Sequence, residues 1–217
     1  MKPGLLILIS GRGSNALAIL DAIEAGVVPA ELRAVVADRP CAGLERVAAR
    51  GIDTALIPRT AFKQRDDFER ALSETIAGYS PELIVLAGFM RVLSAGFVER
   101  HAGRMINIHP SLLPKYRGLD THARALAAGD SLHGASVHWV TAELDGGPVI
   151  ARAEVEIRPG DDAERLAARV LAQEHRLYPA ALALLLADVV SSGHEIDPKS
   201  EILVLDRDLD DRGRRIG

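Results

Sequence analysis

Short apolar runs alternate with segments of helical periodicity through the first half of the chain. Each apolar run is bounded by turn-forming residues, and each periodic segment ends near a glycine. The runs predict strands at residues 5–9, 32–37, 54–57 and 83–86. The periodic segments predict helices at residues 15–25, 44–50 and 66–77, the last closed by Gly78. Such alternation is typical of a parallel sheet covered by helices on both faces.

The second half of the chain has a different pattern. Residues 105–109 predict a further central strand, which a proline-rich loop follows at residues 110–118. Residues 133–140 and 148–155 are two strand-like runs joined by a glycine turn, and they predict an antiparallel pair at the sheet edge. We therefore expect an α/β fold with a Rossmann-like, mostly parallel twisted sheet, helices on both faces and antiparallel strands in the C-terminal half.

The last third of the chain predicts a long helix. Asp161 or Asp162 could cap its N-terminus, and Pro179 is expected to kink or divide it, because proline cannot donate the helical hydrogen bond. Residues 201–205 are a candidate last strand within a charged tail. In the proline-rich loop at residues 110–118, the peptide bond between Leu113 and Pro114 could be trans or cis.

Composition excludes several classes of protein. The chain has 217 residues, of which 48% are hydrophobic and 26% charged, so an ordinary globular protein is expected rather than a disordered or fibrous one. A net charge of −4 and 4% aromatic residues argue against binding of nucleic acid. Cys41 is the only cysteine, which excludes an intramolecular disulfide and a cysteine-based zinc site. We expect no membrane segment.

A glycine-rich loop joins the first predicted strand to the first helix. Residues 11–16 read Gly-Arg-Gly-Ser-Asn-Ala, and their backbone N–H groups could hold a phosphate at the helix N-terminus. Ser14 and Asn15 could also cap the helix. The same loop loosely fits a dinucleotide fingerprint with Asp38 as the ribose-binding acid, and it could equally be a tight turn with no ligand.

Asn107 and His109 form the most informative pair. Residues two apart on a strand point to the same face, so the amide and the imidazole are expected to project together. Acyl transfer needs such groups, one to stabilise an oxyanion and one to donate or shuttle a proton. Asp145, beside two glycines, could keep His109 cationic if it lies next to it. The alternatives are a packing histidine, a loop-anchoring asparagine and a turn aspartate.

Residues 107–118, Asn-Ile-His-Pro-Ser-Leu-Leu-Pro-Lys-Tyr-Arg-Gly, closely resemble the signature of the folate-dependent formyltransferases. Residues 11–15, 86–91 and 143–148 resemble, in order and spacing, the branch of that family whose acceptor is phosphoribosylglycinamide. Gln173, Glu174 and His175 also fit, and the resemblance covers roughly residues 4–190. It implies transfer of the formyl group of 10-formyltetrahydrofolate to the acceptor's amino group, a step of purine synthesis.

The resemblance also implies an organisation. Residues 1–190 would form a single catalytic domain, with a phosphate-binding lobe at 1–100 and a folate-binding and catalytic lobe at 101–190. Residues 191–217 would be a C-terminal tail. The enzyme would be cytoplasmic, a monomer or homodimer, and would need neither a metal, a membrane nor nucleic acid.

The resemblance assigns roles by position. Gly13, Ser14 and Asn15 would hold the substrate phosphate, and Glu174 its ribose or glycinamide end. The catalytic residues would be Asn107, His109 and Asp145. The folate would contact Arg65, Met90, Arg91, Val92, Leu93, Asn107, Thr141, Ala142, Glu143, Leu144 and Asp145.

Two positions depart from the family pattern. Some members carry a histidine where this chain has Asp120 and a proline where it has Arg117, so an auxiliary role of that histidine cannot be transferred.

Rival functions remain. Methionyl-tRNA formyltransferase and formyltetrahydrofolate hydrolase are expected to be longer, with an extra C-terminal and N-terminal domain respectively. An NAD-linked oxidoreductase and a non-catalytic nucleotide-binding module would use the glycine loop but leave the residues around His109 without a role.

Overall fold

One continuous eight-stranded sheet organises the computed structural model, which describes residues 2–192 and 203–205. Its strands are β1 (Gly4–Ile9), β2 (Glu31–Ala37), β3 (Thr54–Leu56), β4 (Leu83–Leu86), β5 (Met105–His109), β6 (Leu132–Trp139), β7 (Val149–Glu156) and β8 (Leu203–Leu205). The order is β3-β2-β1-β4-β5-β6-β7-β8. Strands β1 to β5 run parallel, β6 is antiparallel to both its neighbours, and β8 is parallel to β7. The expected Rossmann-like sheet with antiparallel C-terminal strands is confirmed.

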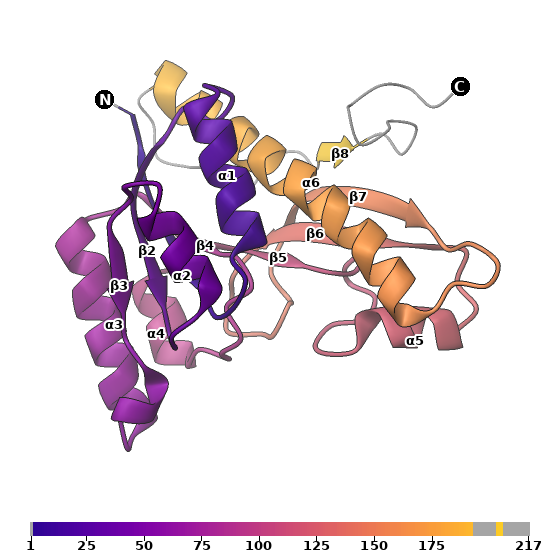
Figure 1. Ribbon diagram of the computed structural model, residues 1–217, viewed down its shortest axis with the longest axis horizontal. Coiled ribbons are helices and arrows are strands. Elements are labelled where there is room, and N and C mark those ends of the chain that lie inside the picture. The colour runs from indigo at the N-terminus through magenta and orange to yellow at the C-terminus, as the bar shows by residue number, and fades with distance from the viewer. Residues whose placement is uncertain (1, 193–202, 206–217) are drawn as a thin grey trace.

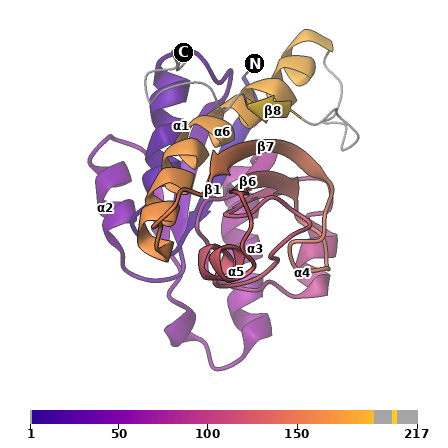
Figure 2. The same ribbon diagram turned by 90° about the vertical axis from the view of Figure 1, so that its right-hand side faces the viewer.

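Helices cover both faces of this sheet. They are α1 (Ser14–Glu24), α2 (Ala42–Ala48), α3 (Arg65–Tyr79), α4 (Ala95–Arg100), α5 (Thr121–Ala127) and α6 (Ala163–Ser192). Figure 1 shows α6 running diagonally beside α1, and Figure 2 shows α1, α2 and α6 on one side of the sheet with α3 and α4 on the other. None of the helices in the described part of the chain is long and apolar enough to cross a membrane.

The alternation along β1 explains the two layers. Leu5, Ile7 and Ile9 pack with α1 and α6, whereas Leu6 and Leu8 pack with α3 and α4. All five side chains are fully buried, because successive residues of a strand point to opposite faces and both faces are covered.

The end of α3 and two short helices differ from the prediction. Helix α3 runs through Gly78 to Tyr79 and ends at Ser80, which adopts the left-handed conformation with φ 45°. The Ser80 hydroxyl donates to the carbonyl of Ala77 (3.0 Å), so a serine takes the place expected for the glycine. Two short helices, α4 and α5, were not predicted.

Pro179 does not divide the long C-terminal helix. Helix α6 is continuous over thirty residues, and Leu177, Tyr178 and Leu182 around the proline are fully buried against the sheet. Packing of this apolar face outweighs the lost hydrogen bond. Of the two candidate caps, Asp162 is the one used, since its carboxylate accepts from the N–H of Arg165 (2.8 Å).

The tail was expected to carry a strand over residues 201–205. Strand β8 covers Leu203–Leu205 and pairs with β7, so β7 is not the edge of the sheet; residues 201 and 202 lie outside the described part. The bond between Leu113 and Pro114 is cis.

Candidate active site

The glycine loop lies at the carboxyl end of β1, against the start of α2. Gly13 adopts φ 69°, and a Cβ there would lie 2.8 Å from the Cα of Gly43. The N–H of Gly43 donates to the carbonyl of Gly11 (3.1 Å), so two backbone segments meet without side chains between them. Gly13 is the N-cap of α1, and no side chain caps the helix. The expectation that Ser14 or Asn15 caps it is wrong.

The Asn15 side chain instead contacts Glu174. Its amide nitrogen donates to the Glu174 carboxylate (2.8 Å), and both residues are buried. Burial raises the pKa of Glu174, and the hydrogen bond from Asn15 only partly offsets this effect. The amide oxygen of Asn15 is buried and has no partner among the described residues. The pair therefore offers oxygen acceptors beside the glycine loop, which suits a ligand that donates hydrogen bonds.

Asp38, the candidate ribose-binding acid of a dinucleotide site, is occupied by the protein itself. Its buried carboxylate pairs with Arg91 and Arg39. Burial alone would raise the pKa of Asp38, but hydrogen bonds from Ser10, Arg39 and Arg91 lower it overall. Arginine side chains already donate to both carboxylate oxygens of Asp38. The carboxylate is therefore not free to bind a ribose, as the dinucleotide interpretation requires.

The segment Met90–Leu93 lies beside a small cavity of about 280 Å³. The hydroxyl of Ser10 accepts from the N–H of Met90 (2.8 Å), and the guanidinium of Arg65 donates to the carbonyl of Val92 (2.6 Å). Arg65 also pairs with the buried Glu69 (2.8 Å). The structure therefore places Arg65 against the segment Met90–Leu93, which was predicted to contact the folate together with it.

Apolar side chains are exposed around this region. Met90 is 64% exposed, Val92 68% and Leu144 52%, although large apolar residues are usually covered. All three belong to the segments predicted to bind the folate.

A second, larger cavity of about 560 Å³ lies at the opposite end of the strands near Lys2 and Arg33, whereas ligands of open α/β sheets bind at the carboxyl ends.

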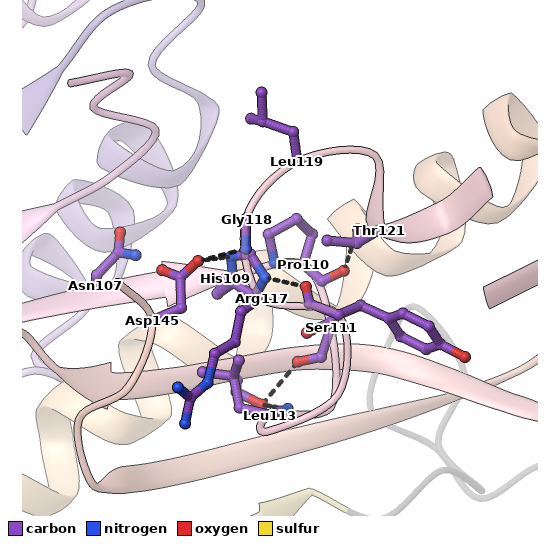
Figure 3. A network of polar contacts seen from close by, with 12 residues as sticks. Asn107, His109, Pro110, Ser111, Leu113, Arg117, Gly118, Leu119, Thr121 and Asp145 are labelled. Carbon is purple, nitrogen blue, oxygen red and sulfur yellow. Dashed lines mark hydrogen bonds and ion pairs between the residues drawn. The ribbon is translucent and has the colours of Figure 1, made fainter. Parts of the chain in front are cut away.

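Asn107, His109 and Asp145 come together at the end of β5 (Figure 3). Nδ1 of His109 lies 3.4 Å from the Asp145 carboxylate. That carboxylate also accepts from the N–H of Gly118 (2.9 Å), and Nε2 of His109 contacts the carbonyl oxygen of Tyr116 (2.8 Å). The spatial contact that spacing alone left open is present in the structure.

Both ring nitrogens of His109 face acceptors. A carbonyl oxygen has no proton to donate, so the hydrogen of the contact with Tyr116 must sit on Nε2. The second proton of an imidazolium would then sit on Nδ1, which faces Asp145. Only the cation satisfies both contacts, and its Nδ1 hydrogen lies on the side of the ring towards Asp145.

His138 is a member of this cluster that the sequence analysis missed. It lies opposite Asn107 on the neighbouring strand β6. Its Nδ1 must donate to the carbonyl of Trp139 (3.0 Å), so its Nε2 accepts from the Asn107 amide (3.2 Å). Burial lowers the pKa of His138, which favours this neutral form. The alternation of Ser136 and His138 on one strand face was the available signal.

The turn that carries Asp145 is held tightly to the end of β6. Asp145 adopts φ 47°, and a Cβ on Gly147 would lie 1.8 Å from the carbonyl oxygen of Trp139. Only glycine allows this approach. Within the turn, the Thr141 hydroxyl donates to the carbonyl of Glu143 (3.3 Å), and Ala142 and Leu144 complete the predicted segment.

The structure shows the environment of Arg117 and Asp120, the two positions that depart from the family pattern. Arg117 pairs with Glu143, and Asp120 precedes α5 with φ 58° and makes no side-chain cap. His122, one residue into α5, contacts His133 (3.1 Å). Among the described residues, no group of three or more histidine, cysteine or acidic side chains could hold a metal ion.

The buried histidines predict a loss of stability in mild acid. Burial lowers the pKa of His133 to about 4 from its ordinary value of 6.5. The unfolded chain therefore binds this proton at higher pH than the folded chain, so the free energy of unfolding falls as the pH drops from 6.5 towards 4. His133 alone contributes a loss of roughly 3 kcal/mol over this range. Urea unfolding at a series of pH values should show a shallower decline for His133→Gln, and an unchanged slope would contradict the assignment.

Comparisons with known proteins agree with the geometry. A sequence profile described as formyl transferase matches residues 4–182. The chain is 50% identical over 179 residues to the phosphoribosylglycinamide formyltransferase of Escherichia coli (strain K12), covering 82% of this chain and 84% of that protein. It is 41% identical over 177 residues to the enzyme of the same name from Haemophilus influenzae, covering 81% and 84%.

Solved structures show the same relationship. The phosphoribosylglycinamide formyltransferase of Coxiella burnetii superposes with a TM-score of 0.84 at 46% identity, covering 94% of this chain and 100% of that chain. The one from Brucella melitensis gives 0.82 at 46% identity, covering 86% and 97%. On its sequence, its fold and the residues gathered at the end of β5, this chain belongs to the formyl transferase family.

Proposed function

We propose that this chain transfers the formyl group of 10-formyltetrahydrofolate to the amino group of phosphoribosylglycinamide. The products are formylglycinamide ribonucleotide and tetrahydrofolate, in the synthesis of purines. The observation that carries the proposal is the cluster of Asn107, His109 and Asp145, which places an amide and a carboxylate around one imidazole at the carboxyl end of a central strand. A relative that is 50% identical bears the name of this activity.

The two substrates would occupy adjacent parts of this edge of the sheet. Gly13, Ser14 and Asn15 would bind the phosphate at the N-terminus of α1, and Glu174 would accept hydrogen bonds from the ribose or the glycinamide. The folate would lie against backbone groups and exposed apolar side chains of two segments, with Arg65 beside it. Those segments are Met90, Arg91, Val92, Leu93 and Thr141, Ala142, Glu143, Leu144, Asp145.

Transfer would proceed directly, without a covalent enzyme intermediate. The neutral amine attacks the formyl carbon, and the formyl oxygen becomes an oxyanion. The second amide hydrogen of Asn107 donates to that oxygen. Cationic His109 stabilises it by its positive charge and by the Nδ1 hydrogen, which it would share with Asp145 3.4 Å away, and Asp145 keeps the imidazolium oriented. The bond from the carbon to N10 then breaks, and the amine proton moves to N10 through water or Asp145.

The remaining features follow from the same proposal. Residues 1–190 form one catalytic domain, in which residues 1–100 bind the phosphate and residues 101–190 supply the catalytic residues. The enzyme acts in the cytoplasm on small molecules, as a monomer or homodimer. It needs no metal, because the formyl group is already activated, and it binds neither nucleic acid nor a membrane.

An absorbance assay for tetrahydrofolate release tests the function. We expect release from 10-formyltetrahydrofolate only when phosphoribosylglycinamide is present. Release at the same rate without the acceptor would indicate a hydrolase and contradict the proposal. Binding of phosphoribosylglycinamide with no release would indicate a nucleotide-binding module, and a fluorescence change of NADH on titration would favour an oxidoreductase.

Glu174→Gln is expected to raise the KM for phosphoribosylglycinamide at least about tenfold, because the amide is a weaker acceptor than a carboxylate for the ligand's donors. The KM for the folate should stay within about twofold of the wild-type value, since Glu174 lies at the other substrate. Steady-state kinetics with each substrate varied in turn measures both. Glu164→Gln, the same change at an exposed position of α6, is the matched control. A rise confined to the folate KM would reverse the assignment of the two sites.

A further inference from the structure

Tyr116 is held at both ends in an unfavourable backbone conformation. It adopts φ 55°, which a residue with a side chain rarely does. Its carbonyl oxygen accepts from Nε2 of His109 (2.8 Å), and its hydroxyl donates to the carboxylate of Asp130 (2.8 Å). Such conformations persist where surrounding contacts over-determine them, and they are frequent at functional sites.

Asp130 lies in the short connection between α5 and β6, outside the loop of residues 110–118 that carries Tyr116. Its carboxylate receives the Tyr116 hydroxyl and also the ammonium of Lys115 (3.0 and 3.2 Å). The hydrogen bond raises the pKa of Tyr116 and lowers that of Asp130, so the phenol stays protonated and the carboxylate charged. The other charged and titratable groups around this contact are Arg124 over the Tyr116 ring, and His122 and His133.

We propose that Asp130 and the Tyr116 hydroxyl are positioning groups for formyl transfer, which hold the Tyr116 carbonyl against Nε2 of His109. The inference rests on the proposed function. The contact at Nε2 has two consequences for the reaction. It supplies the acceptor that one of the two imidazolium protons needs, and it orients the ring so that Nδ1 faces Asp145.

Loss of the hydroxyl would act through the backbone. Without the bond to Asp130, Tyr116 is free to relax towards a negative φ, which rotates its carbonyl away from His109. The ring would keep its packing, because Arg124 lies 5.3 Å from its centroid and His133 6.1 Å. The next part of the loop is held independently, since Arg124 donates to the carbonyl of Arg117 (2.7 Å). The effect should therefore be local to His109.

Tyr116→Phe tests the proposal, because it removes only the hydroxyl. We expect kcat to fall about tenfold, the value of one hydrogen bond to a charged group, with both KM values within about twofold of wild type. Asp130→Ala should reproduce this fall in kcat at unchanged KM. Lys115→Met is the matched control: it removes the other partner of Asp130 and should leave kcat unchanged.

A double variant separates positioning from a general effect on the fold. In the His109→Ala background, Tyr116→Phe should cause no further loss of kcat, because its effect passes through the imidazole. A full tenfold loss in that background would overturn the inference. So would a wild-type kcat for Tyr116→Phe, a rise in KM in place of the fall in kcat, or an equal loss in Lys115→Met. In each of these cases the wild-type enzyme still formylates phosphoribosylglycinamide, so failure of the positioning role is distinguishable from failure of the function.

Discussion

His109→Ala and Asn107→Ala are each expected to lower kcat at least about a hundredfold, with little change in either KM. A positioned acid supplies about 10²–10⁴-fold of rate and an oxyanion donor about 10²–10³-fold, and each variant removes one of these groups. The loss should fall on kcat because both groups act on charge that develops only in the transition state. Tetrahydrofolate release under saturating substrates measures it.

The control for these variants is another buried histidine. His101 lies at the end of α4 and packs on Phe97, away from the cluster, so His101→Gln should keep kcat within a few-fold of wild type. Turnover by His109→Ala within a few-fold of wild type would refute the catalytic assignment. For Asn107 the contact with His138 offers a second check, since removal of the amide leaves Nε2 of His138 without its donor.

Asp145→Asn is expected to lower kcat by about ten- to a hundredfold, because an amide can accept from Nδ1 of His109 but cannot balance its charge. If Asp145 acts through the imidazole, the same substitution should have a much smaller effect when residue 109 is alanine. A double-mutant cycle on kcat measures this coupling.

The alternative outcome of the cycle is also informative. Additive losses would mean that Asp145 acts independently of His109, as it would if its main role were to carry the amine proton to N10. Asp53→Asn, the same substitution at an exposed turn before β3, is the control for the loss of one negative charge. It should leave kcat unchanged.

Local patterns predicted the layout of the chain and part of the site. The order of strands and helices follows from short apolar runs and helical periods. Seven of the eight strands begin and end within one residue of the predicted bounds. The common face of Asn107 and His109 follows from the two-residue repeat of a strand, which no tertiary contact alters. The motif around these residues then placed the chain in a family, which the comparisons confirmed.

Where sequence reasoning failed, packing outweighed local preference. Pro179 was expected to kink or divide α6, but the apolar face of that helix is buried along the sheet and the helix is not divided. Asn15 was expected to cap α1, but its amide is closer to an acceptor 159 residues away, Glu174. In both cases the deciding contact comes from a distant part of the chain, which no local window contains.

The sequence by itself determined which strand carries Asn107 and His109, that the two share a face, and that a glycine loop opens the first helix. Only the tertiary structure decided that Asp145 lies against His109, that His138 holds Asn107, and that Tyr116 and Asp130 support the imidazole from the other side. The physical reason is the range of the interactions. Pleat and helical repeat act between neighbours, whereas these hydrogen bonds depend on how strands and loops far apart in the sequence meet at one end of the sheet.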